Sequence, residues 1–263
     1  MGDHVVRPRR KLKHRFYVAP SRVPSPPDAS ELVIDRDTAH HVRNVLRLAS
    51  GAAVILFDNT GKEYEAELVE CKPSRVTARI ISAAFPAVES PLKITLAQAL
   101  IKGNSFDKLI TLSAELGCAR IIPLFTARTV LKLGKAAAAD RVKRWERIAQ
   151  EAAAQSGRVK VPVVEMPLEF KEFLARQSQG LNIILYERGG VGQLREMLKD
   201  VEGGQSEAMT LLAGPEGGFE PAEVELAINS GFKVWGLGPR VLRAENAGAI
   251  AMSILQYHCG DMG

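Results

Sequence analysis

Two glycine-rich loops in the second half of the chain restrict its fold more than any other feature. Residues 214–218 have the sequence GPEGG and follow the apolar run 209–213, and residues 237–243 have the sequence LGPRVLR and follow the apolar run 232–237. Each run has the length and composition of a buried strand, and each loop leads into a helical pattern. This order of strand, glycine turn and helix predicts an α/β domain with a mainly parallel sheet.

Loops of this kind favour one class of ligand. Backbone N–H and C=O groups exposed side by side at strand ends can hold a flat, polar small molecule without a charged side chain. The sequence has no G-x-x-x-x-G-K-[ST] and no G-x-G-x-x-G that opens a helix, which excludes the two common phosphate cradles. We therefore expect a cofactor recognised through its base and ribose. The alternative is that GPEGG is only a tight turn between a strand and a helix.

The positive charge of the chain is concentrated at one end. Residues 1–15 contain six Lys or Arg residues and one Asp, which accounts for the whole net charge of +5. A basic arm of this kind, with Arg9 and Arg10 at its centre, binds nucleic acid by releasing counterions from phosphates. A solvated terminal tail is the alternative interpretation.

Several classes of protein are excluded. No apolar run is long enough to span a bilayer, and the basic N-terminus is not followed by the apolar segment of a secretory signal. Cys71, Cys118 and Cys259 are far apart and form no C-x-x-C. We therefore expect no disulfide, no metal site and no membrane contact, and we expect a cytoplasmic protein.

The sequence pattern changes at the proline-containing segment 85–91, which we interpret as a linker. Before it we expect a β-rich module with a helix from a cap at Asp37 to Leu48, and strands at 14–18, 54–57, 63–69 and 75–81. After it we expect strands at 94–100, 120–125, 181–186, 209–213 and 232–237. The helices expected between and after them span 105–116, 135–156, 192–199, 221–230 and 246–258.

The motifs resemble those of one known family. Over nearly its whole length the chain is similar to the bacterial 16S rRNA uridine-N3 methyltransferases, the ribosomal RNA small subunit methyltransferase E family of the SPOUT superfamily. The resemblance rests on GPEGGF at 214–219 and LGPRVLR at 237–243, supported by HHVRNVLRL at 40–48, ELG at 115–117 and QSGR at 155–158. The chain departs from the family at 244–246, where Ala-Glu-Asn replaces the usual Thr-Glu-Thr. Asn246 can still cap the final helix.

The resemblance implies a fold that periodicity does not predict. It implies an α/β SPOUT methyltransferase domain over 91–263, with a parallel sheet and a C-terminal trefoil knot, although knots are rare in proteins. It also implies a PUA-like β-barrel over 16–86 that docks RNA, preceded by the basic arm 1–15. The implied cofactor is S-adenosyl-L-methionine, and the implied partner is the 16S rRNA of the small ribosomal subunit.

Candidate site residues follow from the positions of the motifs. The expected cofactor-binding residues are Leu185, Glu187, Leu212, Ala213, Gly214, Pro215, Glu216, Gly217, Leu237, Gly238, Arg240, Val241 and Leu242. Because the proton on N3 must leave, the reaction needs a base or an anion-stabilising group, and the candidates are Glu216, Arg243 and Glu245. RNA contacts are expected from Arg9, Arg10, Arg43, Arg47 and Arg158. Glu216 can instead accept backbone hydrogen bonds within its turn, and Arg43 and Arg47 can instead form a solvated face.

The final helix has small residues on several faces and suits close packing. We expect it to form a two-fold homodimer through a face that contains Ala247, Ile250, Ala251 and Leu255. Two other functions stay open at this point. One is methylation of transfer RNA or of a ribose 2′-oxygen by another SPOUT enzyme, and the other is a non-catalytic role in ribosome assembly.

Overall fold

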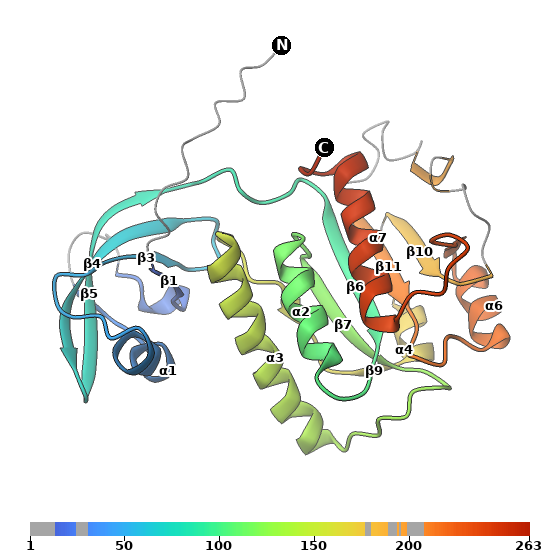
Figure 1. Cartoon of the computed structure of the whole chain (residues 1–263), viewed down its shortest axis with the longest axis horizontal. Helices are drawn as coiled ribbons and strands as arrows, with labels where there is room; N and C mark the ends of the chain where they lie inside the picture. The colour runs from blue at the N-terminus through green and yellow to red at the C-terminus, as the bar shows by residue number, and fades with distance from the viewer. Residues whose placement is uncertain (1–13, 25–30, 177–179, 189–193, 195, 199–207) are drawn as a thin grey trace, which may run out of the picture. The chain divides into compact units, whose positions relative to one another are not determined.

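The computed structural model describes residues 14–24, 31–176, 180–188, 194, 196–198 and 208–263 (Figure 1). By its internal contacts the chain divides into two units. The first contains Met1–Val88 and Ala153–Lys160, and the second contains Glu89–Ala152 and Val161–Gly263. The predicted basic arm falls almost wholly outside the described residues. The predicted domain boundaries at 86 and 91 stay a prediction.

The first unit is built on a five-stranded sheet with the order β1-β3-β4-β5-β2. The strands are β1 (His14–Tyr17), β2 (Glu31–Val33), β3 (Ala53–Phe57), β4 (Glu63–Lys72) and β5 (Arg75–Ala84), with a short 3-10 turn η1 (Pro20–Arg22) after β1. Along β4, Tyr64, Ala66 and Leu68 are buried in one apolar cluster, as their alternation with glutamates predicts. Within the described residues β1 and β2 are the two edges of the sheet, so its closure into a barrel stays a prediction.

The predicted helix from Asp37 to Leu48 is divided in the structure. Helix α1 (Arg36–His40) continues as the π-helical turn η2 (His41–Val45). The N-cap is Asp35, whose Oδ1 accepts the N–H groups of Asp37 and Thr38 at 3.1 and 3.0 Å. The prediction of Asp37 as the cap was therefore wrong, because the extended backbone at Asp35 places its carboxylate in front of the free N–H groups.

The second unit contains a seven-stranded sheet, and its parallel pairing is confirmed. The order is β12-β10-β11-β6-β7-β8, with β9 also paired to β7, and each of these pairs is parallel. The strands are β6 (Lys93–Ala99), β7 (Arg120–Phe125), β8 (Val163–Val164), β9 (Leu168–Glu169), β10 (Leu181–Leu185), β11 (Ala208–Ala213) and β12 (Lys233–Trp235). The helices are α2 (Ser105–Glu115), α3 (Lys135–Ser156), α4 (Phe170–Ala175), α6 (Pro221–Asn229) and α7 (Ala244–Cys259).

Helices cover both faces of this sheet (Figure 1). Successive residues of a strand point to opposite faces, so Leu96 and Leu211 belong to a cluster with residues of α2 and α7. Their neighbours Ala97 and Leu212 belong to a second cluster with residues of α4 and α6. The strands are therefore apolar on both sides, which is typical of a buried parallel sheet. The predicted helix at 192–199 falls largely outside the described residues, and the trefoil knot stays a prediction.

Helix α7 differs from the prediction at its start and on its outer face. It begins at Ala244 with Arg243 as its N-cap residue, so Asn246 lies inside the first turn and does not cap the helix. Ala251 and Leu255 are buried in the apolar cluster of their own chain. Their assignment to a dimer face was therefore wrong, because the sheet and α2 already cover that side of the helix. Among the described residues no helix is both long and apolar enough to cross a membrane.

Candidate functional site

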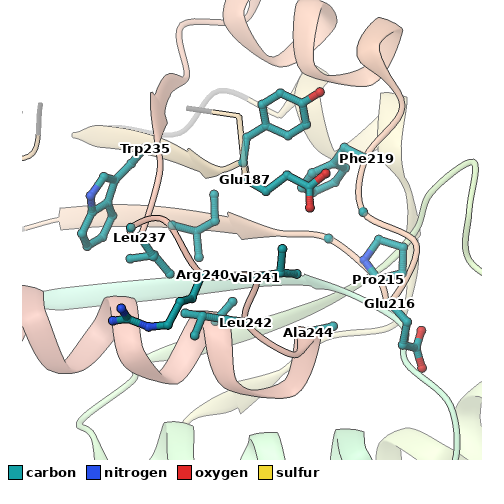
Figure 2. A pocket seen from close by; sticks show the side chains of 16 residues that line it. Glu187, Pro215, Glu216, Phe219, Trp235, Leu237, Arg240, Val241, Leu242 and Ala244 are labelled. Atoms are coloured by element: carbon teal, nitrogen blue, oxygen red, sulfur yellow. The ribbon is translucent and has the colours of Figure 1, made fainter. Parts of the chain in front are cut away.

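A pocket opens where β10, β11 and β12 end. The three strands are parallel neighbours, so the loops that follow them leave the sheet at the same edge. The pocket is open to solvent, and its lining encloses about 730 Å³ when that open space is included. Figure 2 shows its lining, which consists of Leu185, Tyr186, Glu187, Gly214, Pro215, Glu216, Gly218, Phe219, Trp235, Leu237, Gly238, Arg240, Val241, Leu242, Ala244 and Ala247.

The structure brings most of the predicted cofactor-binding residues together at this pocket. Of those residues, all except Leu212, Ala213 and Gly217 are part of the lining. Leu212 and Ala213 are buried strand residues whose side chains pack inside the domain. Sequence reasoning missed Trp235 and Phe219. Trp235 is the last residue of β12 but lies inside the strand predicted at 232–237, so its position at the strand end was not visible in the sequence. Phe219 directly follows the GPEGG loop, and that position was the signal that could have found it.

The glycines of the two loops serve different purposes. Gly218 and Gly238 have φ values of +69° and +119°, which residues with a side chain rarely adopt. Gly217 does not have a positive φ, but a Cβ there would lie 3.3 Å from the side chain of Arg128. A Cβ on Gly214 would lie 3.2 Å from the ring of Phe219. Glycine at 214 and 217 therefore permits close packing of the loop.

The carboxylate of Glu216 is held by the backbone of a neighbouring loop. Its Oε1 accepts the N–H of Lys102 at 2.8 Å. In Figure 2 the charged ends of Glu216 and Arg240 point outward, away from the apolar side chains of Leu237, Val241 and Leu242. The carboxylate of Glu187 is turned toward Phe219. The position of Glu216 suits a residue that supports the loop, and its catalytic role stays a prediction.

The other two catalytic candidates lie at the start of α7. Arg243 is the N-cap residue, and its side chain is 83% exposed. Its Nη1 lies 4.0 Å from Oε1 of Glu245, which is in the first helical turn. Neither belongs to the lining formed by the described residues, but Ala244 between them does. Both residues are therefore adjacent in sequence to a residue of the pocket lining. The negative charge of Glu245 lies in the first helical turn, where the helix dipole stabilises it.

The predicted RNA contacts that the structure describes, Arg43, Arg47 and Arg158, all belong to the first unit. Arg9 and Arg10 lie outside the described residues. Arg43 is half-buried in the π-helical turn, and Arg47 is exposed just after it with a φ of +53°. Arg158 is only 6% exposed, so little of it is accessible to RNA in this conformation. These RNA contacts stay predictions. Among the described residues no group of His, Cys, Asp and Glu is placed to hold a metal ion.

Comparison with known protein families gives two matches. An RNA methyltransferase domain matches residues 88–256, and an RNA methyltransferase PUA domain matches residues 34–81. The chain is 34% identical over 247 residues to ribosomal RNA small subunit methyltransferase E of Synechocystis, covering 92% of this chain and 79% of that protein. It is 33% identical over 235 residues to the protein of the same name from Bacillus subtilis, covering 88% and 91%.

Two solved structures are similar over almost their full length. One is a methyltransferase from Legionella pneumophila in complex with its bound cofactor SAM, with 34% identity, a TM-score of 0.87 and coverage of 95% of this chain and 99% of that chain. The other is a ribosomal RNA small subunit methyltransferase E from Neisseria gonorrhoeae bound to S-adenosyl methionine. It has 30% identity, a TM-score of 0.83 and coverage of 95% and 100%.

Proposed function

Because the chain belongs to the ribosomal RNA small subunit methyltransferase E family, we propose that it methylates N3 of one uridine in 16S rRNA. The family determines the class of reaction, which is methylation of small-subunit ribosomal RNA with S-adenosyl-L-methionine as the methyl donor. The choice of N3 and of a single uridine is our proposal. We place the reaction in the cytoplasm, where the ribosomal subunits are found.

The observation that carries this proposal is the chemistry of the pocket at the three strand ends. S-adenosyl-L-methionine has a flat adenine, a polar ribose and a zwitterionic methionine tail. The lining offers apolar surface from Trp235, Leu237 and Leu242, the carboxylate of Glu187 and the backbone of two glycine-rich loops. Flat apolar walls with a few polar groups are typical of a site for such a molecule. When bound, the cofactor would supply a methyl group activated by its sulfonium sulfur, and the rest of the cofactor is the leaving group.

The two charged residues at the start of α7 are our candidates for the groups that take part in removing the proton from N3. N3 is an imide nitrogen, and its proton must be removed before or during methyl transfer. We propose that Glu245 accepts this proton and that Arg243 stabilises the negative charge left on the uridine. The side chain of Arg243 is 83% exposed, so it can reach an RNA base. Glu216, which is bonded to Lys102, holds the loop in our proposal.

We also propose a homodimer in which α7 contacts a second copy of the chain. The outer face of α7 presents Asn246, Ile250 and Tyr257, which are exposed and lie at positions i, i+4 and i+11. Ile250 and Tyr257 are large apolar or amphipathic side chains, which suit an interface. This face keeps Ile250 from the one expected from the sequence but not Ala251 and Leu255, which are buried. Light scattering of Ile250→Arg, with Glu225→Arg on the exposed face of α6 as control, tests the assembly.

The function is tested by locating the methyl group on RNA. Small ribosomal subunits are incubated with the protein and isotopically labelled S-adenosyl-L-methionine, and the RNA is digested and mapped by mass spectrometry. We expect one labelled uridine, with the label on the base at N3. A labelled ribose, or labelling of transfer RNA in its place, would contradict the proposal. Cofactor binding without any methyl transfer would instead indicate a non-catalytic assembly factor.

A further inference from the structure

Gln98 is a buried polar side chain that the sequence-based site does not include. It lies near the end of β6 and is 0% exposed. Strand β6 pairs with β11, and Gln98 is in register with Ala213, the last residue of β11. Burying an amide is unfavourable unless its polar atoms are hydrogen-bonded. The bonds that Gln98 makes therefore indicate why an amide occupies this place.

The amide nitrogen of Gln98 donates to the chain at the start of the GPEGG loop. Nε2 lies 2.9 Å from the carbonyl oxygen of Gly214 and 3.1 Å from that of Ala99. The carbonyl oxygen of Ala213 is farther away, at 3.5 Å. The two hydrogens of the amide match the two shorter bonds. Gln98 thus joins the end of β6 to a loop that lies more than a hundred residues farther along the chain.

The hydrogen bond from Gln98 to Gly214 engages the one polar group of the Gly214–Pro215 peptide unit, the carbonyl of Gly214. Pro215 follows Gly214 and has no N–H, so the carbonyl of Gly214 is the only hydrogen-bonding group between them. Gly214 and Pro215 line the pocket, whereas Gln98 is not part of the lining formed by the described residues. The bond therefore turns this carbonyl toward β6 and sets the orientation of the peptide plane that forms the pocket wall.

Helix α7 approaches the other end of the same amide. A Cβ on Gly248 would lie 3.0 Å from Cδ1 of Leu96 and 3.5 Å from Oε1 of Gln98. Oε1 is buried and has no hydrogen-bond partner among the described residues. An unpaired buried oxygen is destabilising. Any stabilising contribution of the Gln98 amide therefore comes from the hydrogen bonds that its nitrogen donates to Ala99 and Gly214. The residues Ala244 and Ala247 of α7 also line the pocket.

We propose that Gln98 is a positioning residue for cofactor binding. Its amide nitrogen holds the Gly214–Pro215 peptide in the orientation that the cofactor requires, and its side chain fills the space between that loop and α7. The inference rests on the proposed function, because the ligand concerned is S-adenosyl-L-methionine. Gln98 itself does not contact the reacting atoms.

Gln98→Glu tests this proposal because it replaces only the donor. At a pH above the pKa of the introduced carboxyl, a carboxylate would face the carbonyl oxygens of Gly214 and Ala99, and we expect S-adenosyl-L-methionine to bind at least tenfold more weakly there. Burial beside these carbonyls raises the pKa of the introduced carboxyl. Its protonated form can donate to Gly214 again, so the affinity relative to wild type should recover as the pH is lowered from 8 to 5. Calorimetry over this range measures both effects.

Two further variants separate positioning from loss of stability. Gln98→Met keeps the size but has no donor, so its affinity should be reduced at least tenfold at every pH. Gln256 is a matched control, because it is also buried and its Nε2 donates to the carbonyl of Leu116 over a distance of 2.8 Å. Neither Gln256 nor Leu116 is part of the pocket lining formed by the described residues. Gln256→Glu should lower the melting temperature but leave the affinity within twofold of wild type.

The outcomes distinguish this proposal from the proposed function. If folded Gln98→Glu and Gln98→Met bind the cofactor as wild type does, the positioning role is wrong. It is equally wrong if Gln256→Glu reduces affinity as much as Gln98→Glu. If the wild type binds the cofactor but transfers no methyl group to uridine, the proposed function is wrong and the role of Gln98 in binding stands. A wild type that does not bind the cofactor overturns both.

Discussion

The GPEGG loop after β11 and the LGPRVLR loop after β12 face the same pocket, but the surrounding chain holds them differently. The first loop is bonded to Gln98, to the N–H of Lys102 and to Arg128, whose Nη1 donates to the carbonyl of Gly217 at 2.7 Å. In the second loop, Val241 is 81% exposed, and the Arg243 side chain is exposed as well.

This difference indicates how the site is divided. A loop bonded on several sides is held in its bound conformation before the ligand arrives, which reduces the cost of binding. A loop with exposed side chains can adjust when RNA, cofactor or a second copy of the chain arrives. We therefore interpret the first loop as the rigid wall of the pocket and the second as its adaptable wall.

The largest effect is expected at Gly238, the position in the second loop whose backbone conformation requires glycine. At Gly238 the φ of +119° is strained for any residue with a side chain, at a cost of about 1–3 kcal/mol. Gly238→Val should weaken binding of S-adenosyl-L-methionine by about five- to 150-fold, measured by calorimetry. Gly51→Val is the control, because Gly51 also has a positive φ and open space but lies in the first unit. Wild-type affinity in Gly238→Val would remove this residue from the site.

A smaller effect is expected from the residue that anchors the helix after the first loop. Glu223 is buried, and its carboxylate accepts the N–H groups of Ala127 at 2.8 Å and Glu220 at 2.9 Å. Glu223→Ala leaves both donors unpaired and should destabilise the protein by about 1–3 kcal/mol. We expect the cofactor to bind about three- to tenfold more weakly. Glu225→Ala on the exposed side of α6 should change neither value, and equal effects of both variants would contradict the rigid-wall interpretation.

Arg128 should contribute less, because its bond to the first loop is exposed. The side chain is 47% exposed, so the bond to Gly217 is worth about 0.5–1 kcal/mol after solvent screening. Arg128→Ala should therefore reduce cofactor affinity about two- to fivefold. The reduction should shrink further in high salt, and Lys132→Ala in the same segment serves as control. A tenfold loss that is independent of salt would show that this contact is as important as the one from Gln98.

The smallest effect is expected at the exposed tip of the second loop. Val241→Ala should change stability by less than about 0.5 kcal/mol, as is usual for exposed positions. Cofactor affinity should stay within twofold of wild type, measured by the same calorimetry. A large loss of affinity would show that this loop is as fixed as the first, and the comparison between the two walls would fail.

Much of the site could be predicted from the sequence, because its residues follow strands in local motifs. Leu185, Gly214 and Leu237 each end or follow an apolar run, and parallel strands end at one edge of a sheet. The bond from Gln98 to Gly214 could not be predicted. It depends on β6 and β11 being neighbours in a particular register, and no local pattern in the sequence specifies that pairing.

By itself the sequence determined the alternation of strands and helices, the two glycine-rich loops and the family. These features are local, since they depend on the periodicity of apolar residues and on turn residues at fixed spacing. The tertiary structure decided which face of α7 is exposed, that Asp35 caps α1, and that the carboxylate of Glu216 is bonded to Lys102. The last of these contacts joins residues far apart in the chain. Such contacts depend on how the elements pack, because burial leaves each polar group only the partners that packing brings to it.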